Sequence, residues 1–158
     1  MVTPMEPWIF IAGFVPLFLL VWFGSMFLIA RVGGWRDLAR VYREETPMEF
    51  ARQWRNKYGK MRYATGYNGC LNIAASAMGM RLWLWTMFRP AHPPLFIPWS
   101  DISTAVEQGI FVEMVRFSFQ RVPGATLVLR RKLAEEILRA VPGVTSAAWL
   151  LSPRAGER

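Results

Sequence analysis

The side chains that could carry catalysis are few and lie far apart in the sequence. The chain has one histidine, His92, and one cysteine, Cys70, among its 158 residues. His92 stands between Ala91 and Pro93 in a proline-rich stretch, which favours a turn or surface residue over a general base or metal ligand. Cys70 has no neighbouring base and stands in an apolar stretch, which is typical of a buried, unreactive thiol.

The acidic residues show no catalytic spacing. Glu107 and Glu113 fall in or beside expected strands with no second carboxylate at a fixed interval, and Asp101 stands where it would cap a turn. The pair Gly33-Gly34 follows an apolar segment rather than a strand, so it does not indicate a phosphate loop. One Cys and one His also exclude a disulfide scaffold and a Cys/His zinc site. We therefore expect a non-enzymatic protein with no metal and no cofactor.

The first structural element expected along the chain is a long apolar segment. Residues 8–30, WIFIAGFVPLFLLVWFGSMFLIA, are 23 residues without a charged side chain. At ~1.5 Å rise per residue they reach about 34 Å, enough to cross a hydrocarbon core of ~30 Å. A cleaved signal peptide fits less well, because the basic leading region and the small-residue cleavage site are missing. The segment predicts a transmembrane helix with Pro16 inside it.

The positive charge of the chain is concentrated just after this segment. The formal net charge is +8, and residues 31–62 alone carry nine basic and four acidic side chains. Because Lys and Arg beside a span stay on the cytoplasmic side, we expect the N-terminus outside and the rest of the chain in the cytoplasm. The same region could bind anionic lipid head groups. The candidate residues for that contact are Arg31, Trp35, Arg36, Arg40, Arg43, Arg52, Arg55 and Lys57.

Two short helices are expected between the apolar segment and the rest of the chain. Trp35, Leu38 and Tyr42 recur at helical spacing, which predicts an amphipathic helix. That helix could lie along the lipid head groups with Trp35 at the interface, or it could pack on the domain, and the sequence favours neither. The capping box of residues 46–49 then predicts a helix over residues 47–58 that ends at Gly59.

A second apolar stretch, residues 70–88, contains one charged residue, Arg81. We reject a second membrane span, because a charge near its middle costs ~2.5 to 3.5 kcal/mol on insertion scales. The stretch instead predicts two strands, residues 72–76 and 80–88, joined by the tight turn Ala77-Met78-Gly79.

Alternating apolar and polar residues continue toward the C-terminus. Strands are expected over residues 95–99, 102–106, 111–119 and 125–130, and Pro98 suits an edge strand. Residues 131–141 then have helical spacing. Consecutive antiparallel strands followed by one helix predict an α+β domain: a small antiparallel barrel or curled sheet capped by a C-terminal helix.

These residues resemble a known superfold. From about residue 67 to 141, with GMRL at residues 79–82 and LFIPWSDI at residues 95–102, the chain looks like the pleckstrin-homology (PH) and GRAM-like domains. It is similar above all to small bacterial membrane-anchored proteins with a PH-like domain, in which a Phe-Arg-x-x-His-Pro-Pro run precedes Ile-Pro-Trp. The resemblance covers roughly half the chain and implies a binding module for lipid head groups or protein segments. The expected turn Ala77-Met78-Gly79 lacks the Lys and Arg that hold phosphoinositides in lipid-binding members.

We therefore expect a scaffold or binding module for protein–protein interaction at the membrane, acting through a sheet edge or the groove beside the final helix. Its partner would be an unidentified membrane or cytoplasmic protein or a second copy of the chain. The candidate contacts are Trp83, Trp85 and Trp99, although alternating aromatics in strands are more often core. The alternative is a module that binds anionic lipid. Nucleic acid is not an expected partner, because no recognition motif accompanies the basic residues.

The expected organisation has five parts. An extracytoplasmic N-terminus (1–7) precedes the transmembrane helix (8–30), a basic amphipathic linker (31–62), the PH-like domain (63–145) and a C-terminal tail (146–158). Together with the resemblance, the charge asymmetry predicts a single-pass protein of the bacterial inner membrane.

Overall fold

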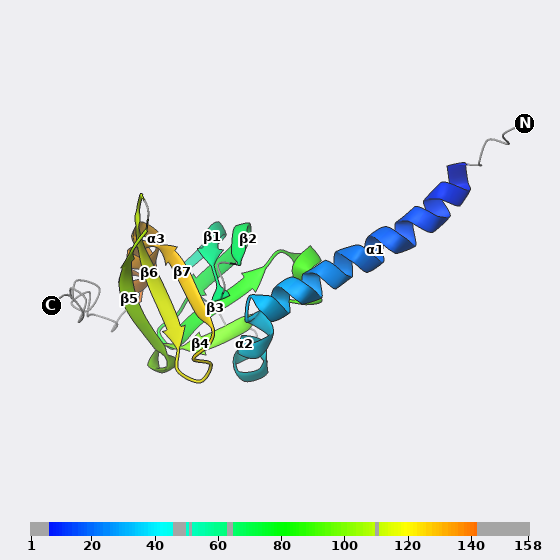
Figure 1. Cartoon of the computed structure of the whole chain (residues 1–158). Coiled ribbons are helices and arrows are strands. Elements are labelled where there is room, and N and C mark those ends of the chain that lie inside the picture. The colour runs from blue at the N-terminus through cyan, green and yellow to red at the C-terminus, as the bar shows by residue number, and fades with distance from the viewer. Residues whose placement is uncertain (1–6, 46–49, 51, 63–64, 110, 142–158) are drawn as a thin grey trace, which may run out of the picture.

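A long helix extends from a domain built on one curled sheet (Figure 1). The computed structural model describes residues 7–45, 50, 52–62, 65–109 and 111–141, so the expected capping box and C-terminal tail lie outside the described residues. The helices are α1 (Pro7–Val32), α2 (Trp35–Tyr42) and α3 (Arg131–Arg139). The strands are β1 (Arg52–Lys60), β2 (Gly66–Ala75), β3 (Gly79–Leu84), β4 (Leu95–Pro98), β5 (Ile102–Gln108), β6 (Glu113–Phe119) and β7 (Thr126–Arg130). Two 3-10 turns are η2 (Thr86–Phe88) and η3 (Trp99–Asp101).

Helix α1 matches the apolar segment expected from the sequence. It is 26 residues long and continues past Pro16. Its segment Ile11–Val32 has a mean hydropathy of 2.2, and most of its side chains are exposed, Leu20 at 71% among them. A helix of this length and apolar character is able to span a membrane.

The junction between α1 and α2 decides between the two placements of the second helix. Gly34 turns the chain with φ of +80°, a conformation that favours glycine. Trp35, Leu38 and Tyr42, the apolar face of α2, are all buried in the domain core. The amphipathic helix therefore packs on the domain. The expectation that Trp35 contacts lipid head groups is wrong, because its indole is enclosed by protein.

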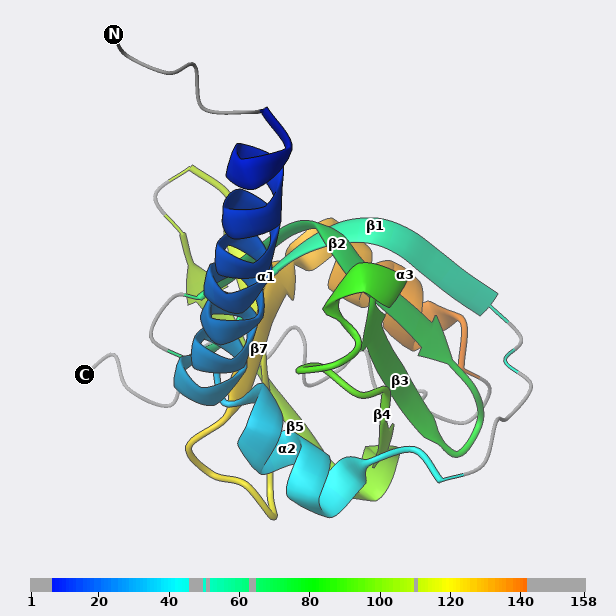
Figure 2. The ribbon, with the colours of Figure 1, turned by 90° about the vertical axis from the view of Figure 1, so that its right-hand side faces the viewer.

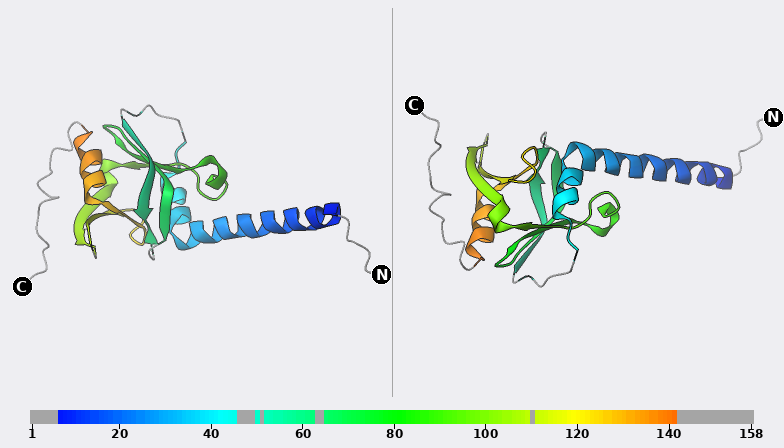
Figure 3. Two further views of the ribbon diagram at one scale, coloured as in Figure 1. Left: turned by 90° about the horizontal axis from the view of Figure 1, so that it is seen from above. Right: turned by 90° about the horizontal axis from the view of Figure 1, so that it is seen from below.

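The sheet is antiparallel and curls into a half-barrel. Its strand order is β4-β3-β2-β1-β7-β6-β5. Strands β1 and β7 pair only at Lys60 and Val128, so the sheet bends there and its two halves face each other (Figure 2). The core between them includes Ile73 and Leu82 from one half and Phe117 from the other. Helix α3 closes this space, on the side of the sheet opposite to α1 (Figure 3).

The hairpin expected from the second apolar stretch is confirmed. Strands β2 and β3 pair from Ala75 and Met80 onward, and the turn is closed by the Ser76 N–H, which donates to the Gly79 carbonyl at 3.0 Å. Strand β3 ends at Leu84, earlier than expected, because the chain turns into η2. The four later strands and the C-terminal helix expected from the sequence correspond to β4–β7 and α3, with shifted ends.

The helix expected over residues 47–58 is wrong. Residues 52–60 form β1, which pairs with β2 along its length and buries Trp54 opposite Ile73. A short helix is marginal in isolation, and the pairing of β1 with β2 and β7 outweighs its local signals. The described part of the linker expected over residues 31–62 therefore contains α2 and β1. The first two strands are connected by residues 61–65, not by Ala77-Met78-Gly79, and Arg62 lies in this connection.

Gly79 provides a test of the β3–β4 packing. A Cβ added there would lie 2.5 Å from the Ile97 carbonyl oxygen, whereas at Gly66 the nearest atom is the Asn68 Oδ1 at 3.5 Å. We expect Gly79→Ala to lower the free energy of unfolding by about 1 to 3 kcal/mol, and Gly66→Ala to change it by less than about 1 kcal/mol. Denaturant unfolding of the full chain in detergent micelles measures both. Equal effects of the two variants would contradict this packing.

Candidate interaction surfaces

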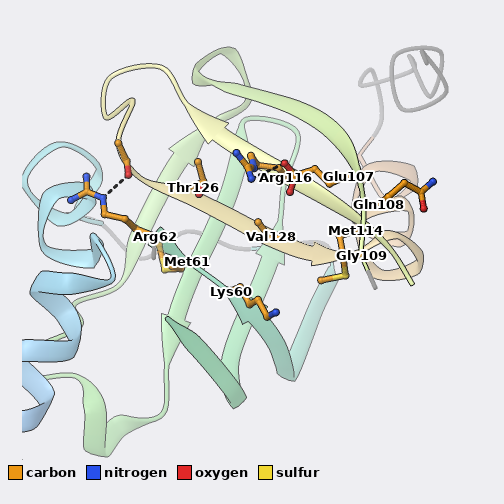
Figure 4. A pocket seen from close by; sticks show the side chains of 11 residues that line it. Lys60, Met61, Arg62, Glu107, Gln108, Gly109, Met114, Arg116, Thr126 and Val128 are labelled. Carbon is orange, nitrogen blue, oxygen red and sulfur yellow. Dashed lines mark hydrogen bonds and ion pairs between the residues drawn. The ribbon is translucent and has the colours of Figure 1, made fainter. Parts of the chain in front are cut away.

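An open groove on the outer side of β5, β6 and β7 is a large hollow among the described residues (Figure 4). Its volume is about 670 Å³, and its lining includes Lys60, Arg62, Glu107 and Arg116. Two of its cations are already engaged: Arg62 forms an ion pair with Asp37 at 2.9 Å, and Arg116 with Glu107 at 2.6 Å. The lining is polar, two of its three cations are paired with carboxylates, and none of its side chains is a nucleophile beside a base.

The acidic residues considered from the sequence are held in ion pairs with arginine. Besides the Glu107 pair in the groove, Glu113 contacts Arg131 at 2.6 Å, and Asp101 contacts Arg121 at 3.0 Å. Within the described part of the chain, no three His, Cys, Asp or Glu side chains gather as metal ligands would.

His92 lies at a turn, as one of the two expected alternatives states, but it is not a surface residue. Its side chain is 1% exposed and lies under the α1–α2 junction, with its ring centroid 5.4 Å from that of Trp35 and 5.6 Å from that of Tyr67. The Tyr67 hydroxyl lies 3.1 Å from Nε2 of His92, and the Phe88 carbonyl oxygen lies 3.3 Å from Nδ1. A tautomer with the proton on Nδ1 satisfies both contacts, with Tyr67 donating to Nε2.

Burial lowers the pKa of His92 to about 4, because the charged ring would lose water without gaining an acidic partner. Burial raises the pKa of Tyr67 as well. Both rings are therefore neutral near pH 7. Cys70 is half-buried, and its burial raises the pKa of the thiol, which suppresses the reactive thiolate. His92 and Tyr67 thus form a packed, hydrogen-bonded support for the junction.

The fold divides the basic residues expected at the membrane surface into two groups. Arg31, Arg36 and Arg40 are exposed on the corner between α1 and α2, and Arg43 is exposed just after α2. The second group comes from β1: Arg52 and Arg55 are exposed and Lys57 is half-buried.

The three tryptophans expected to contact a partner do not form one surface. Trp83 is half-buried, and the Arg81 guanidinium lies over its indole, 4.9 Å from the ring centroid of Trp83. Trp85 is 47% exposed, and its indole N–H donates to Asn56 Oδ1 at 2.8 Å. Trp99, in η3, packs against the core and donates to the Ser76 carbonyl at 2.8 Å. Trp99 therefore has a structural role.

A buried ion pair ties the end of α2 to the sheet. Glu44 Oε2 lies 2.7 Å from an Arg81 guanidinium nitrogen, and the two side chains are only 6% and 20% exposed. Phe50 and Trp83 contact the same guanidinium, at 5.5 and 4.9 Å from their ring centroids. Sequence analysis missed this pair because its members are far apart in the chain, although a charge inside an apolar strand indicates the need for a partner.

The two edges of the sheet differ in what they present. At the β4 edge Pro98 has no N–H to offer. The backbone of Arg43 forms an isolated antiparallel β-bridge with Leu95, and the Glu44 N–H donates to the Pro94 carbonyl at 3.0 Å. The edge strand β5 is seven residues long and, among the described residues, pairs only with β6. The β4 edge is therefore covered, whereas no described segment covers the β5 edge.

The register shows which residues of β5 face outward. The Gln120 N–H donates to the Asp101 carbonyl before β5, and the Gly109 N–H donates to the Val112 carbonyl after it. Ladder bonds in an antiparallel pair recur at every second residue. The N–H and C=O groups of the even-numbered residues, including Val106, therefore point away from β6 and toward the open edge.

Comparison of the chain with protein-family models, with curated proteins and with solved structures finds no match.

The buried histidine predicts a specific acid sensitivity. In the unfolded chain His92 binds a proton near its ordinary pKa of about 6.5, whereas in the folded protein it does so only near 4. Stability contributed by neutral His92 is therefore complete above pH 6.5 and lost as pH falls toward 4, by roughly 2 to 3 kcal/mol. Unfolding of the wild type and of His92→Gln in micelles at pH 7, 5.5 and 4.5 measures this loss. A wild-type advantage that does not shrink with falling pH would contradict it.

The Glu44–Arg81 pair predicts a large cost when one partner is removed. We expect Glu44→Ala to destabilise the fold by about 2 to 4 kcal/mol, because the guanidinium remains buried without its counter-ion. The matched control is Arg40→Ala, which removes an exposed ion pair with Asp37 at 3.9 Å and should cost no more than about 0.5 kcal/mol. Denaturant midpoints in micelles compare the two, and similar shifts would show that the Glu44–Arg81 pair stabilises no more than a surface pair.

Proposed function

We propose that this protein is a single-pass, membrane-anchored binding module without enzymatic activity, which holds an extended segment of a partner protein along β5. Helix α1 supports the anchor by its length and by the exposure of its apolar side chains. The basic residues that follow it, with Arg31 first, favour a cytoplasmic location of the domain. By the resemblance described above, the membrane would be the inner membrane of a bacterium.

The shape of the domain supports a PH-like interpretation. Seven antiparallel strands in the order β4-β3-β2-β1-β7-β6-β5 curl around one core, and a helix follows the last strand. The region of resemblance from about residue 67 to 141 includes six of these strands and α3. Such a domain is a scaffold for binding, and its ligand has to be argued from its surfaces.

The observation that carries the proposal is the open β5 edge. Among the described residues, this seven-residue strand is paired on one side only, so it offers a row of N–H and C=O groups to another strand, whereas the opposite edge is covered. Figure 1 and Figure 3 show β5 on the side of the domain away from α1. A partner would therefore reach it from the aqueous phase. We commit to an extended protein segment, because main-chain pairing requires a strand rather than a helix or a lipid.

Binding of anionic lipid is the second candidate. It is favoured by Arg31, Arg36 and Arg40, which are exposed together where α1 meets the domain. Each such cation contributes ~1 kcal/mol near an anionic surface. The same residues serve equally as a signal for membrane orientation.

The test uses a photo-crosslinking amino acid at the exposed position Ala105 of the full chain in its native membrane. We expect an adduct with a protein partner that disappears with Val106→Pro, because proline removes an outward N–H without removing a bond to β6. The control variant Val106→Thr keeps that N–H and the size of the side chain, and should retain the adduct.

Two outcomes would overturn the β5 proposal. One is an adduct that survives Val106→Pro in a protein whose unfolding midpoint is unchanged. The other is the absence of a protein adduct together with salt-sensitive binding to anionic vesicles that is lost when Arg31, Arg36 and Arg40 are changed to Gln, which favours the lipid candidate.

A further inference from the structure

One face of α1 is covered by the domain. Trp22, Met26 and Ala30 recur every four residues and so lie on one side of the helix. Met26 is 8% and Ala30 2% exposed, and Trp22 is partly buried. The Trp22 ring stacks on Phe88 of η2, with 6.3 Å between the ring centroids. The domain therefore contacts α1 along its last three turns, not only at its end.

These contacts lie at a depth that a bilayer would occupy. A hydrocarbon core takes ~20 helical residues, and the charge-free segment ends at Ala30. A window of ~20 residues placed anywhere within residues 8–30 ends between residues 27 and 30. Trp22 then lies five to eight residues before the end of the window, which is about 8 to 12 Å inside the hydrocarbon core. Phe88, stacked on Trp22, has to lie at a similar depth. This holds wherever the window is placed within the segment.

The residues around Phe88 suit that environment. Trp85 is 47% and Met87 55% exposed, and Figure 3 shows the turn that carries them projecting from the sheet on the same side as α1. Among the described residues, Arg89 is the first charged side chain after Arg81. Apolar and aromatic side chains are those that enter the boundary between head groups and acyl chains.

Part of the backbone of the turn is paired within the protein. The Phe88 N–H donates to the Trp85 carbonyl at 2.9 Å, and the Arg89 N–H donates to the Thr86 carbonyl at 3.2 Å. The His92 N–H donates to the Phe88 carbonyl at 3.1 Å. Each of these bonds lowers the cost of bringing non-helical backbone toward the acyl chains.

We propose that residues 85–88 form a second membrane contact, a loop that enters the leaflet next to α1 and packs among lipid acyl chains. The inference rests on the proposed anchor, because the depth is measured along α1. The exposed apolar side chains of the loop adjoin α1 through the contact of Phe88 with Trp22, and we therefore take lipid as the occupant of this surface. The domain would then sit partly in the membrane surface, held at two points, and could not swing freely below its anchor.

The test measures depth at single positions. The full chain with Cys70→Ala carries one cysteine labelled with the fluorophore NBD, at Met87, at Leu20 of α1, or at Gln108 of β5 as the aqueous control. Each protein is placed in nanodiscs of phosphatidylcholine and phosphatidylglycerol, with and without lipids that bear a doxyl quencher on the acyl chain. We expect blue-shifted emission and strong quenching at Leu20 and Met87, several-fold greater than at Gln108.

The outcomes separate this inference from the proposed anchor. Quenching at Leu20 but not at Met87 would refute the second contact and leave the membrane span intact. Absence of quenching at both positions would refute the span as well. The Leu20 probe is also measured in a chain that carries Met87→Asp. If the loop is embedded in the leaflet, the new charge should change the depth at which the Leu20 probe is quenched. An unchanged depth would count against an embedded loop.

Discussion

Burial of Trp35 is the interaction on which the arrangement of this molecule depends. Its side chain is fully buried, its indole N–H donates to the Pro93 carbonyl at 2.9 Å, and its ring centroid lies 5.6 Å from that of Tyr67. A buried tryptophan removes about 150 to 250 Å² from water, worth roughly 4 to 6 kcal/mol before entropy is counted. Because Trp35 comes directly after Gly34, this burial holds the end of α1 against the half-barrel.

The fixed junction gives the domain two sides with different roles. The turn after β3 lies beside α1, where Trp22 stacks on Phe88, and it presents Trp85 and Met87, the side that we propose meets lipid. On the opposite side, the outward N–H and C=O groups of β5 pair with no other strand among the described residues. A flexible connection between α1 and the domain would remove this difference between the two sides, since either surface could then turn toward the membrane. The Glu44–Arg81 pair holds the other end of α2 and keeps the same geometry.

The sequence predicts those elements whose signals are local. Three elements are each predicted by their own pattern: α1 by its apolar run, β6 by its alternation and α3 by its helical spacing. Pro98 correctly indicates an edge strand. Strand β1 was not predictable in this way, because Asn56 has φ of +56° and the register shifts between Trp54 and Lys57, which breaks the alternation. The burial of His92 and the open edge of β5 depend on which distant segments meet, and neither leaves a pattern within a short window.

The most direct test of a rigid junction is a distance distribution between α1 and the far side of the domain. Spin labels at Leu20 and Ser103, both exposed, in a full-length chain with Cys70→Ala can be measured by pulsed electron resonance in nanodiscs. A fixed junction predicts one narrow distribution that broadens in Trp35→Ala. A broad or multiple distribution in the chain with native Trp35 would contradict it, because the half-barrel would then hang from α1 without a fixed orientation.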